Sequence, residues 1–223
     1  MMHGSQAKKS PRNLQSEEHL FFPSEEMAVE DKPKESAVHR TVVDKDMVDW
    51  FAQLFDSASM VPHFTPASAI PEEVPESIQL RSYSLRDVDQ KGLYLQDRNL
   101  IAAPLQGDNS AQEEILSVLP NRYMDRARIP LILGVKGGSQ GISCGKDNDP
   151  KLQLEDTNLI HLFYNEEEAK RFTFFKHYNG THTFESANYP GWYLCSPLEA
   201  HNPLTLTNHP GEVNLTDFHF QRK

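Results

Sequence analysis

The sequence has few cysteines, no long apolar run and no excess of positive charge, and each absence excludes a class of protein. Two cysteines among 223 residues, Cys144 and Cys195, are too few for a disulfide framework. We expect both to be buried as free thiols, the common state of such residues. No apolar run approaches the roughly 18 to 20 residues that a membrane span needs, so we expect no membrane insertion.

The charge balance is acidic, with 22 Lys and Arg residues against 32 Asp and Glu residues and a formal net charge of −10. Binding to nucleic acid needs a basic face that contacts phosphates, so this balance argues against a general nucleic-acid binder. Most of the acidity lies in residues 1–77, which hold 7 basic and 14 acidic side chains. The remainder of the chain is close to neutral.

Motifs for catalysis and for cofactors are also missing. The glycine-rich segment at 134–145 lacks the spacing of a phosphate-binding loop, and Asp147 stands where that motif needs Ser or Thr. A hairpin between Leu133 and Cys144, with glycines at positive φ in its turn, explains the segment better. The histidines show no zinc-ligand spacing, and there is no Gly-x-Ser-x-Gly elbow. We therefore expect no enzyme, no cofactor and no metal site.

Residues 1–77 are poor in aliphatic side chains and rich in Glu, Ser, Lys and Pro, which predicts a mainly disordered segment. A short amphipathic helix near 46–56 interrupts it, with apolar residues at helical spacing: Met47, Trp50, Phe51, Leu54 and Phe55. Two interpretations stay open. The helix either docks on a partner or on the folded domain, or it forms transiently without a partner.

From residue 80 to 223 the sequence changes to short apolar runs separated by turn residues. About a dozen strands, many of them 8 to 15 residues apart, predict an all-β barrel or sandwich. One helical piece is expected within 157–170. Periodicity does not choose between a sandwich, a closed barrel and a trefoil.

The segment 184–204, FESANYPGWYLCSPLEAHNPL, resembles the signature of the interleukin-1 family. The residues that match are Phe184, Ser186, Ala187, Pro190, Tyr193, Leu194, Cys195 and Leu204, and Ser196 replaces the usual Thr. The resemblance extends over about 81–221. Within the family, it is greatest to the branch of the interleukin-36 receptor antagonist, interleukin-38 and the interleukin-1 receptor antagonist.

The resemblance implies a β-trefoil of twelve strands over 80–223, preceded by an acidic propiece over 1–77. It also implies an extracellular cytokine that binds an interleukin-1-family receptor of the interleukin-36 type by protein contacts and regulates inflammatory and immune signalling. The expected partners are that receptor, its accessory chain and a processing protease, and we expect a monomer. One alternative is a receptor antagonist that fails to recruit the accessory chain. Another is a β-trefoil binding module that is not a cytokine, since fold does not fix function.

The candidate receptor-binding residues lie in two places. The loop at 121–128 combines residue types that are enriched in binding hot spots, and its candidates are Arg122, Tyr123, Met124, Asp125 and Arg126. The resemblance adds Asn214 and Asp217 near the C-terminus. Asp217 favours an agonist over an antagonist only slightly, because acidic residues occur at that position in both.

The resemblance also implies that a protease removes the propiece and thereby activates the protein. In the interleukin-36 group the cut lies a set distance before an Ala-x-Asp element; here Leu85-Arg86-Asp87 occupies that place and points to Glu76 or Ser77. A caspase-like cut after Asp56 is the alternative. The first twenty residues lack the apolar core of a secretory signal. We therefore expect a cytoplasmic protein that is released to the extracellular space without a signal peptide.

Overall fold

A computed structural model describes residues 45–58, 78–146 and 149–223. The described strands are β1 (Arg81–Asp87), β2 (Lys91–Gln96), β3 (Asn99–Pro104), β4 (Leu116–Pro120), β5 (Pro130–Val135), β6 (Gln140–Ser143), β7 (Gln153–Asp156), β8 (Thr173–Asn179), β9 (Thr181–Ser186), β10 (Tyr193–Cys195), β11 (Asn202–Pro203), β12 (Thr205–Thr207) and β13 (Phe218–Arg222). The described α-helices are α1 (Lys45–Ala58), α2 (Leu159–Phe163) and α3 (Glu166–Ala169).

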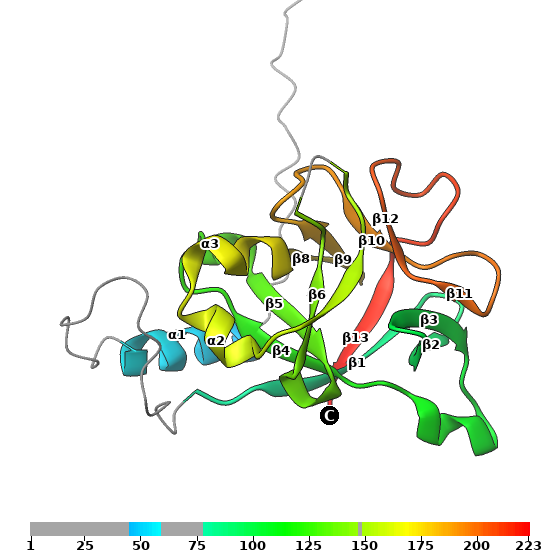
Figure 1. The fold of residues 1–223 in the computed structure, drawn as a ribbon, viewed down its shortest axis with the longest axis horizontal. Helices are drawn as coiled ribbons and strands as arrows, with labels where there is room; N and C mark the ends of the chain where they lie inside the picture. Colours follow the sequence, from blue (N-terminus) through cyan, green and yellow to red (C-terminus); the bar gives the residue numbers. More distant parts are fainter. Residues whose placement is uncertain (1–44, 59–77, 147–148) are drawn as a thin grey trace, which may run out of the picture. The chain divides into compact units, whose positions relative to one another are not determined.

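Six of the strands close into a barrel. β1 pairs with β4, β4 with β5, β5 with β8, β8 with β9, β9 with β13, and β13 returns to β1, all antiparallel. Figure 1 shows the closing pair, in which the last strand β13 (red) lies beside the first strand β1. Closure leaves no barrel strand with an unpaired edge, so this unit is complete within 81–222.

Three smaller strand pairs alternate with the barrel strands along the chain. β2 pairs with β3, β6 with β7, and β10 with β12. Each pair lies in the chain between two barrel strands, which gives three lobes of four strands. The two-residue β11, which pairs with β3, makes a thirteenth strand in the described part of the chain, where the sequence predicted twelve.

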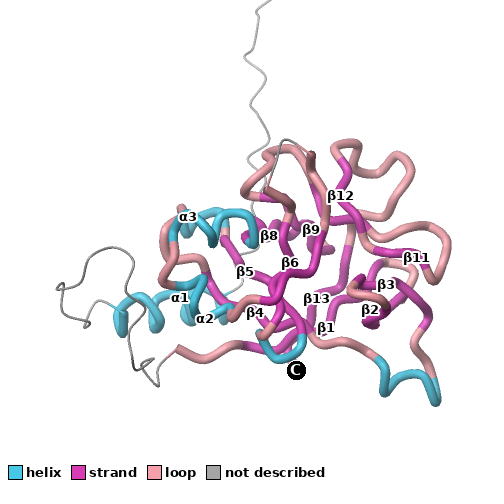
Figure 2. The backbone as a smooth tube through the Cα atoms, in the orientation of Figure 1, coloured by secondary structure: helices cyan, strands magenta, loops and turns pink. Residues whose placement is uncertain are grey.

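The described helices lie outside the barrel (Figure 2), and of these α2 and α3 are short, with five and four residues. The helix expected within 157–170 is divided into α2 and α3, because Asn158 and Asn165 each cap a separate start. Asn158 accepts a hydrogen bond from the backbone N–H of Ile160, and Asn165 accepts one from that of Glu168. None of the helices in the described ranges has the length and apolar character needed to cross a membrane.

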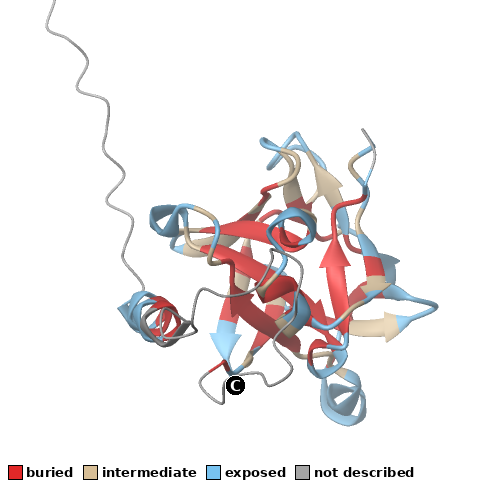
Figure 3. Ribbon diagram, turned by 60° about the vertical axis from the view of Figure 1, so that its left-hand side comes forward, coloured by how far each residue is buried: buried red, intermediate tan, exposed pale blue. Residues whose placement is uncertain are grey.

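The barrel core is made of aromatic and aliphatic side chains. Figure 3 shows that long stretches of the strands are buried. Phe184 is fully buried in this core, and its ring centroid lies 6.2 Å from that of Phe218 and 5.2 Å from that of Phe220. The segment that carries the family resemblance is largely this core: Phe184, Ser186, Ala187, Leu194, Cys195 and Leu204 are all buried. Its residues are therefore explained by packing rather than by contact with a partner.

The predicted hairpin between Leu133 and Cys144 is present as β5 and β6. Its register pairs Gly134 with Gly141, and the turn contains Gly137 and Gly138 at φ of 64° and 92°. Gly141 lies against the ring of Phe172, where an added Cβ would come within 2.6 Å of a ring carbon. The glycines thus permit a tight turn and a close approach of the core.

Both cysteines are free and buried, as the sequence predicted. Burial raises the pKa of Cys144 to about 12, against the weaker opposing effect of a hydrogen bond with Ser186. Burial also raises the pKa of Cys195. At neutral pH neither thiol forms the reactive thiolate to a useful extent.

Candidate functional site

The loop between β4 and β5 carries five of the candidate residues, and Asn121 fixes its base. The buried Asn121 side chain donates a 2.9 Å hydrogen bond to the Thr173 hydroxyl and accepts one of 2.9 Å from the N–H of Tyr123. Its own N–H donates to the carbonyl of Pro130 at 2.9 Å. These bonds fix both ends of the loop to the barrel.

The tip itself is a short helical turn over Arg126–Arg128. Asp125 caps it by accepting a 3.0 Å hydrogen bond from the N–H of Ala127. Ile129 then adopts the left-handed conformation, with φ of 50°, and ends the turn. A β-branched residue rarely adopts this conformation, and the surrounding hydrogen bonds hold it there. The loop is therefore preorganised rather than extended into solvent.

Arginine and aromatic side chains stack along this loop. The guanidinium of Arg122 lies 5.5 Å from the ring centroid of Tyr123 and 5.4 Å from that of Phe163 in α2. Farther along, Arg128 lies 3.6 Å from the ring centroid of Phe175 in β8. Such cation–π contacts hold long side chains in place while leaving the charge accessible.

The outward surface of the loop has the composition of a protein-binding patch. Tyr123 is 37% exposed, Asp125 and Arg126 are exposed, and Arg122 and Met124 are half-buried. Partial burial raises the pKa of the Tyr123 hydroxyl, and the Arg122 charge opposes this less strongly. The hydroxyl therefore stays protonated, so it can donate a hydrogen bond to a partner.

The two other candidates lie at a different place. The half-buried Asp217 accepts a hydrogen bond from the Thr181 hydroxyl, at the turn of the β8–β9 hairpin. Asn214, also half-buried, lies in the preceding loop, next to the bridge between Ser196 and Leu215. The β4–β5 loop instead meets the far end of this hairpin, at Phe175 and Glu185. The two contact points on β9, Thr181 and Glu185, are four residues or roughly 13 Å of strand apart.

Sequence reasoning missed the residues that connect the loop to the hairpin. Arg128 forms a 2.9 Å ion pair with Glu185, and Nε2 of His177 lies 3.3 Å from the same carboxylate. The apolar and aromatic residues of this hairpin predicted its strands, but they gave no indication of a role for the polar residues beside them. Two pairings identify them: the β8–β9 register, which places Phe175 opposite Glu185, and the long-range β5–β8 pairing, which places Pro130 opposite Phe175.

Of the three candidate processing residues, only Asp56 lies within the described part of the chain. Glu76 and Ser77 lie outside the described residues. The backbone of Asp56 is helical, in the last turn of α1. A cut after Asp56 would require that turn to open, because proteases favour exposed, extended chain.

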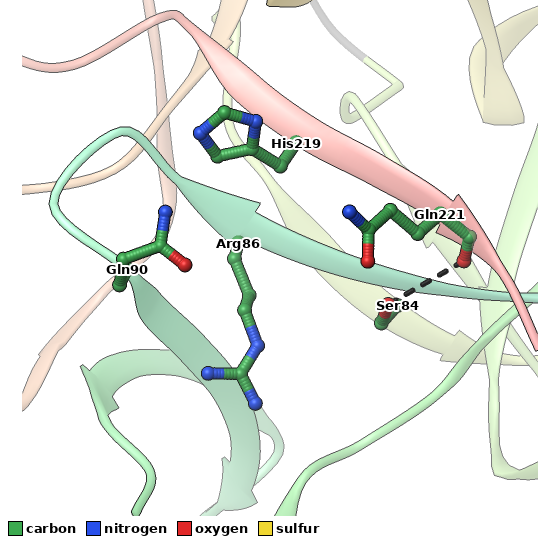
Figure 4. Close-up of a pocket in the computed structure, with 5 residues that line it drawn as sticks. All are labelled: Ser84, Arg86, Gln90, His219 and Gln221. Atoms are coloured by element: carbon green, nitrogen blue, oxygen red, sulfur yellow. Dashed lines mark hydrogen bonds between the residues drawn. The ribbon is translucent and has the colours of Figure 1, made fainter.

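A surface hollow lies over the paired strands β1 and β13, and its polar walls are formed by Ser84, Arg86, Gln90, His219 and Gln221. Ser84 donates a 3.4 Å hydrogen bond to the carbonyl of Gln221, and the Arg86 side chain points away from His219 (Figure 4). Arg86 pairs instead with Glu113 at 3.0 Å. Among the described residues, no three His, Cys, Asp or Glu side chains cluster as a metal site would require. We assign this hollow no ligand.

Comparisons with known proteins identify relatives of the barrel. Residues 105–220 match the family model "Interleukin-1 / 18". The human interleukin-36 receptor antagonist protein is 43% identical over 145 residues, covering 63% of this chain and 94% of that protein.

Two solved structures share the fold. Chicken interleukin 1 beta aligns with a TM-score of 0.55 and 30% identity over 64% of this chain and 96% of its own. Interleukin-36alpha aligns with a TM-score of 0.54 and 29% identity over 68% and 98%. Both are β-trefoil cytokines, so the predicted β-trefoil is confirmed.

Proposed function

The chain belongs to the interleukin-1 family, and from this premise we propose that it is a ligand for an interleukin-1-family receptor of the interleukin-36 type. Proteins of this family are cytokines and receptor antagonists rather than enzymes, and they act outside the cell on receptors of their own family. The choice of receptor is the narrower proposal. It rests on the observations that follow.

The observation that carries the proposal is the shared likeness to two interleukin-36 proteins. The chain aligns with the human interleukin-36 receptor antagonist at 43% identity and with the structure of interleukin-36alpha at a TM-score of 0.54. One of these proteins is named as an antagonist and the other as a pro-inflammatory cytokine. Their common feature is the interleukin-36 system. The rat interleukin-1 receptor antagonist is about as identical, at 42%, but the match covers 79% of that protein against 94% of the human interleukin-36 receptor antagonist, which supports the interleukin-36 type.

We place the receptor contact on the β4–β5 loop. Its Tyr and Arg side chains belong to the types that dominate binding energy in protein interfaces, and the hydrogen bonds of Asn121 and Asp125 preorganise it. Preorganisation lowers the entropy lost on binding. Asp217 contacts the turn of the β8–β9 hairpin, whereas the β4–β5 loop contacts the opposite end of that hairpin. We propose that Asn214 and Asp217 contact a separate part of the receptor pair.

We propose an agonist that recruits the accessory chain after a protease removes the acidic N-terminal segment. The observation that favours the alternative, an antagonist, is the identity of 42% to 43% with proteins named as receptor antagonists. Sequence identity reports the shared fold and the first receptor contact more than it reports recruitment of the second chain. Only a signalling assay separates the two.

The experiment uses the full chain with a specific protease site inserted before Ser77. After cleavage and removal of the N-terminal piece, binding to an interleukin-36-type receptor is measured by surface plasmon resonance, and signalling is measured in reporter cells with and without a known agonist. Binding with reporter activation supports the agonist. Binding that only blocks the added agonist identifies an antagonist, and absence of binding rejects the proposed receptor.

A loop variant tests where the receptor binds. We expect Tyr123→Ala to weaken binding by roughly 30-fold, corresponding to about 2 kcal/mol for a hot-spot residue. Leu198→Ala is the matched control, because Leu198 is also an exposed apolar residue (59%) but lies in the loop after β10. Equal binding by both variants would place the receptor elsewhere on the barrel.

A further inference from the structure

Helix α1 precedes the first barrel strand in the chain, yet one of its faces is buried. Met47, Trp50, Phe51, Leu54 and Phe55 are all buried, whereas the residues between them are exposed. Figure 3 shows the helix divided lengthwise into a buried side and an exposed side. An isolated helix of 14 residues is marginal in water, so this burial against the rest of the fold is what stabilises α1.

One end of α1 contacts the strands that close the barrel. The Asp46 carboxylate forms ion pairs with two arginines. Its Oδ2 lies 3.1 Å from Nη1 of Arg81, at the start of β1, and 3.2 Å from Nη1 of Arg222, at the end of β13. The guanidinium of Arg81 also lies 4.3 Å from the ring centroid of Trp50. Since Asp46 and Arg222 are exposed, these pairs orient the helix more than they stabilise it.

The other end of α1 contacts Arg126 at the tip of the candidate receptor loop. The ring of Phe55 lies against the guanidinium of Arg126, whose Cζ is 3.8 Å from the ring centroid. A small hollow beside this contact is lined by α1 residues together with Arg126 and Ile129 of the loop. From Asp46 to Phe55 the helix rises about 14 Å, so it extends from the barrel seam to the loop tip.

We propose that α1 is an intramolecular inhibitor, which occupies the surface around Arg126 and Ile129 that a receptor would otherwise contact. The inference rests on the proposed function, because it takes the β4–β5 loop as the receptor contact. A receptor side chain and Phe55 cannot both cover the same face of Arg126. Cleavage at Glu76 or Ser77 would leave α1 with no covalent link to the barrel, so α1 could then dissociate.

The contacts of α1 suggest a variant that displaces it without cleavage. Leu54→Asp places a charge on the buried face, which disfavours docking strongly because a buried carboxylate lacks compensating partners. Gln53→Asp is the matched control, since it introduces the same residue one position earlier on the exposed face. Neither substitution changes the β4–β5 loop.

Docking is measured directly through Trp50. The chain has two tryptophans, Trp50 and the half-buried Trp192, so Trp192→Phe leaves Trp50 as a single fluorescent reporter. We expect Leu54→Asp to shift Trp50 emission to the red and to increase its quenching by acrylamide. Gln53→Asp should leave both unchanged. The two buried cysteines should stay unreactive in every variant, which verifies that the barrel is folded.

Receptor binding by the uncleaved variants then tests the proposal. If α1 is docked about 90% to 99% of the time, displacing it raises the apparent affinity by about 10- to 100-fold. We therefore expect uncleaved Leu54→Asp to bind the interleukin-36-type receptor as tightly as the cleaved chain, and Gln53→Asp to bind as weakly as the uncleaved parent.

Three outcomes would overturn the inference, and they can be told apart. Equal binding by the uncleaved parent and the cleaved chain would mean that α1 blocks nothing. Binding by the cleaved chain alone, with no gain in Leu54→Asp when Trp50 is exposed, would assign inhibition to another part of residues 1–77. No binding by any form would instead reject the proposed receptor, and with it the function on which this inference rests.

Discussion

The barrel and helix α1 are both buried against the same core, but they are held in different ways. Each barrel strand has two hydrogen-bonded neighbours, so no strand can leave without breaking a closed circle of pairs. Helix α1 is held mainly by its one apolar face and by the hydrogen bonds and ion pairs of Asp46 with Arg81 and Arg222. The difference separates a unit that must unfold as a whole from one that can detach locally.

The largest expected effect comes from the barrel core. Phe184→Ala removes a fully buried ring that contacts Phe218 and Phe220, and we expect it to lower the free energy of unfolding by about 3–5 kcal/mol. Urea unfolding followed by far-UV circular dichroism measures this. Leu198→Ala, at an exposed position, should change the value by less than about 0.5 kcal/mol. A small effect at Phe184 would mean that the barrel is not the stable unit.

A smaller effect is expected from α1. Trp50→Ala should lower the free energy of unfolding by about 1–3 kcal/mol, because the loss cannot exceed the free energy of docking the helix. Amide hydrogen exchange should become faster in residues 45–58 while β8 and β9 keep their protection. Equal acceleration in the helix and in these strands would show that α1 and the barrel unfold together.

The smallest effect concerns a charge pair on the barrel surface. The Arg171 guanidinium donates hydrogen bonds to Glu155 and holds the pKa of that carboxyl below its usual range, and a further bond from Ser143 acts in the same direction. We expect Glu155→Gln to cost about 1 kcal/mol at pH 7.

The pH dependence of that cost has a definite sign. A lowered pKa in the folded state stabilises the fold fully above the unfolded-state pKa of about 4.3, and the contribution is lost as pH falls through the folded value. The stabilities of the parent and Glu155→Gln, measured by urea unfolding from pH 7 to pH 3, should therefore converge at the acid end. A constant difference across this range would contradict the assignment.

The sequence predicted the all-β class, the hairpin between Leu133 and Cys144 and the free, buried thiols. Local patterns determine these features: alternating apolar residues, glycines at turn positions and a cysteine count of two. The choice of a trefoil over a sandwich came from the family resemblance, because closure of the barrel depends on pairings such as Tyr83 with Arg222, far apart in sequence.

The candidate site was predicted less completely. The β4–β5 loop was identified by composition, but its partners Phe175, Glu185 and His177 lie on a hairpin about fifty residues away in sequence. The contact of Phe55 with Arg126 likewise depends on where α1 docks, which no local pattern encodes. Asn214 and Asp217 remain predictions whose contact with a receptor is untested.

The most direct test of the central claim is receptor binding before and after cleavage. Surface plasmon resonance on an interleukin-36-type receptor should show that the chain cut before Ser77, and freed of its N-terminal piece, binds at least 10-fold more tightly than the intact chain. Equal affinity of the two forms would contradict control by α1. Absence of binding by both forms would contradict the proposed receptor itself.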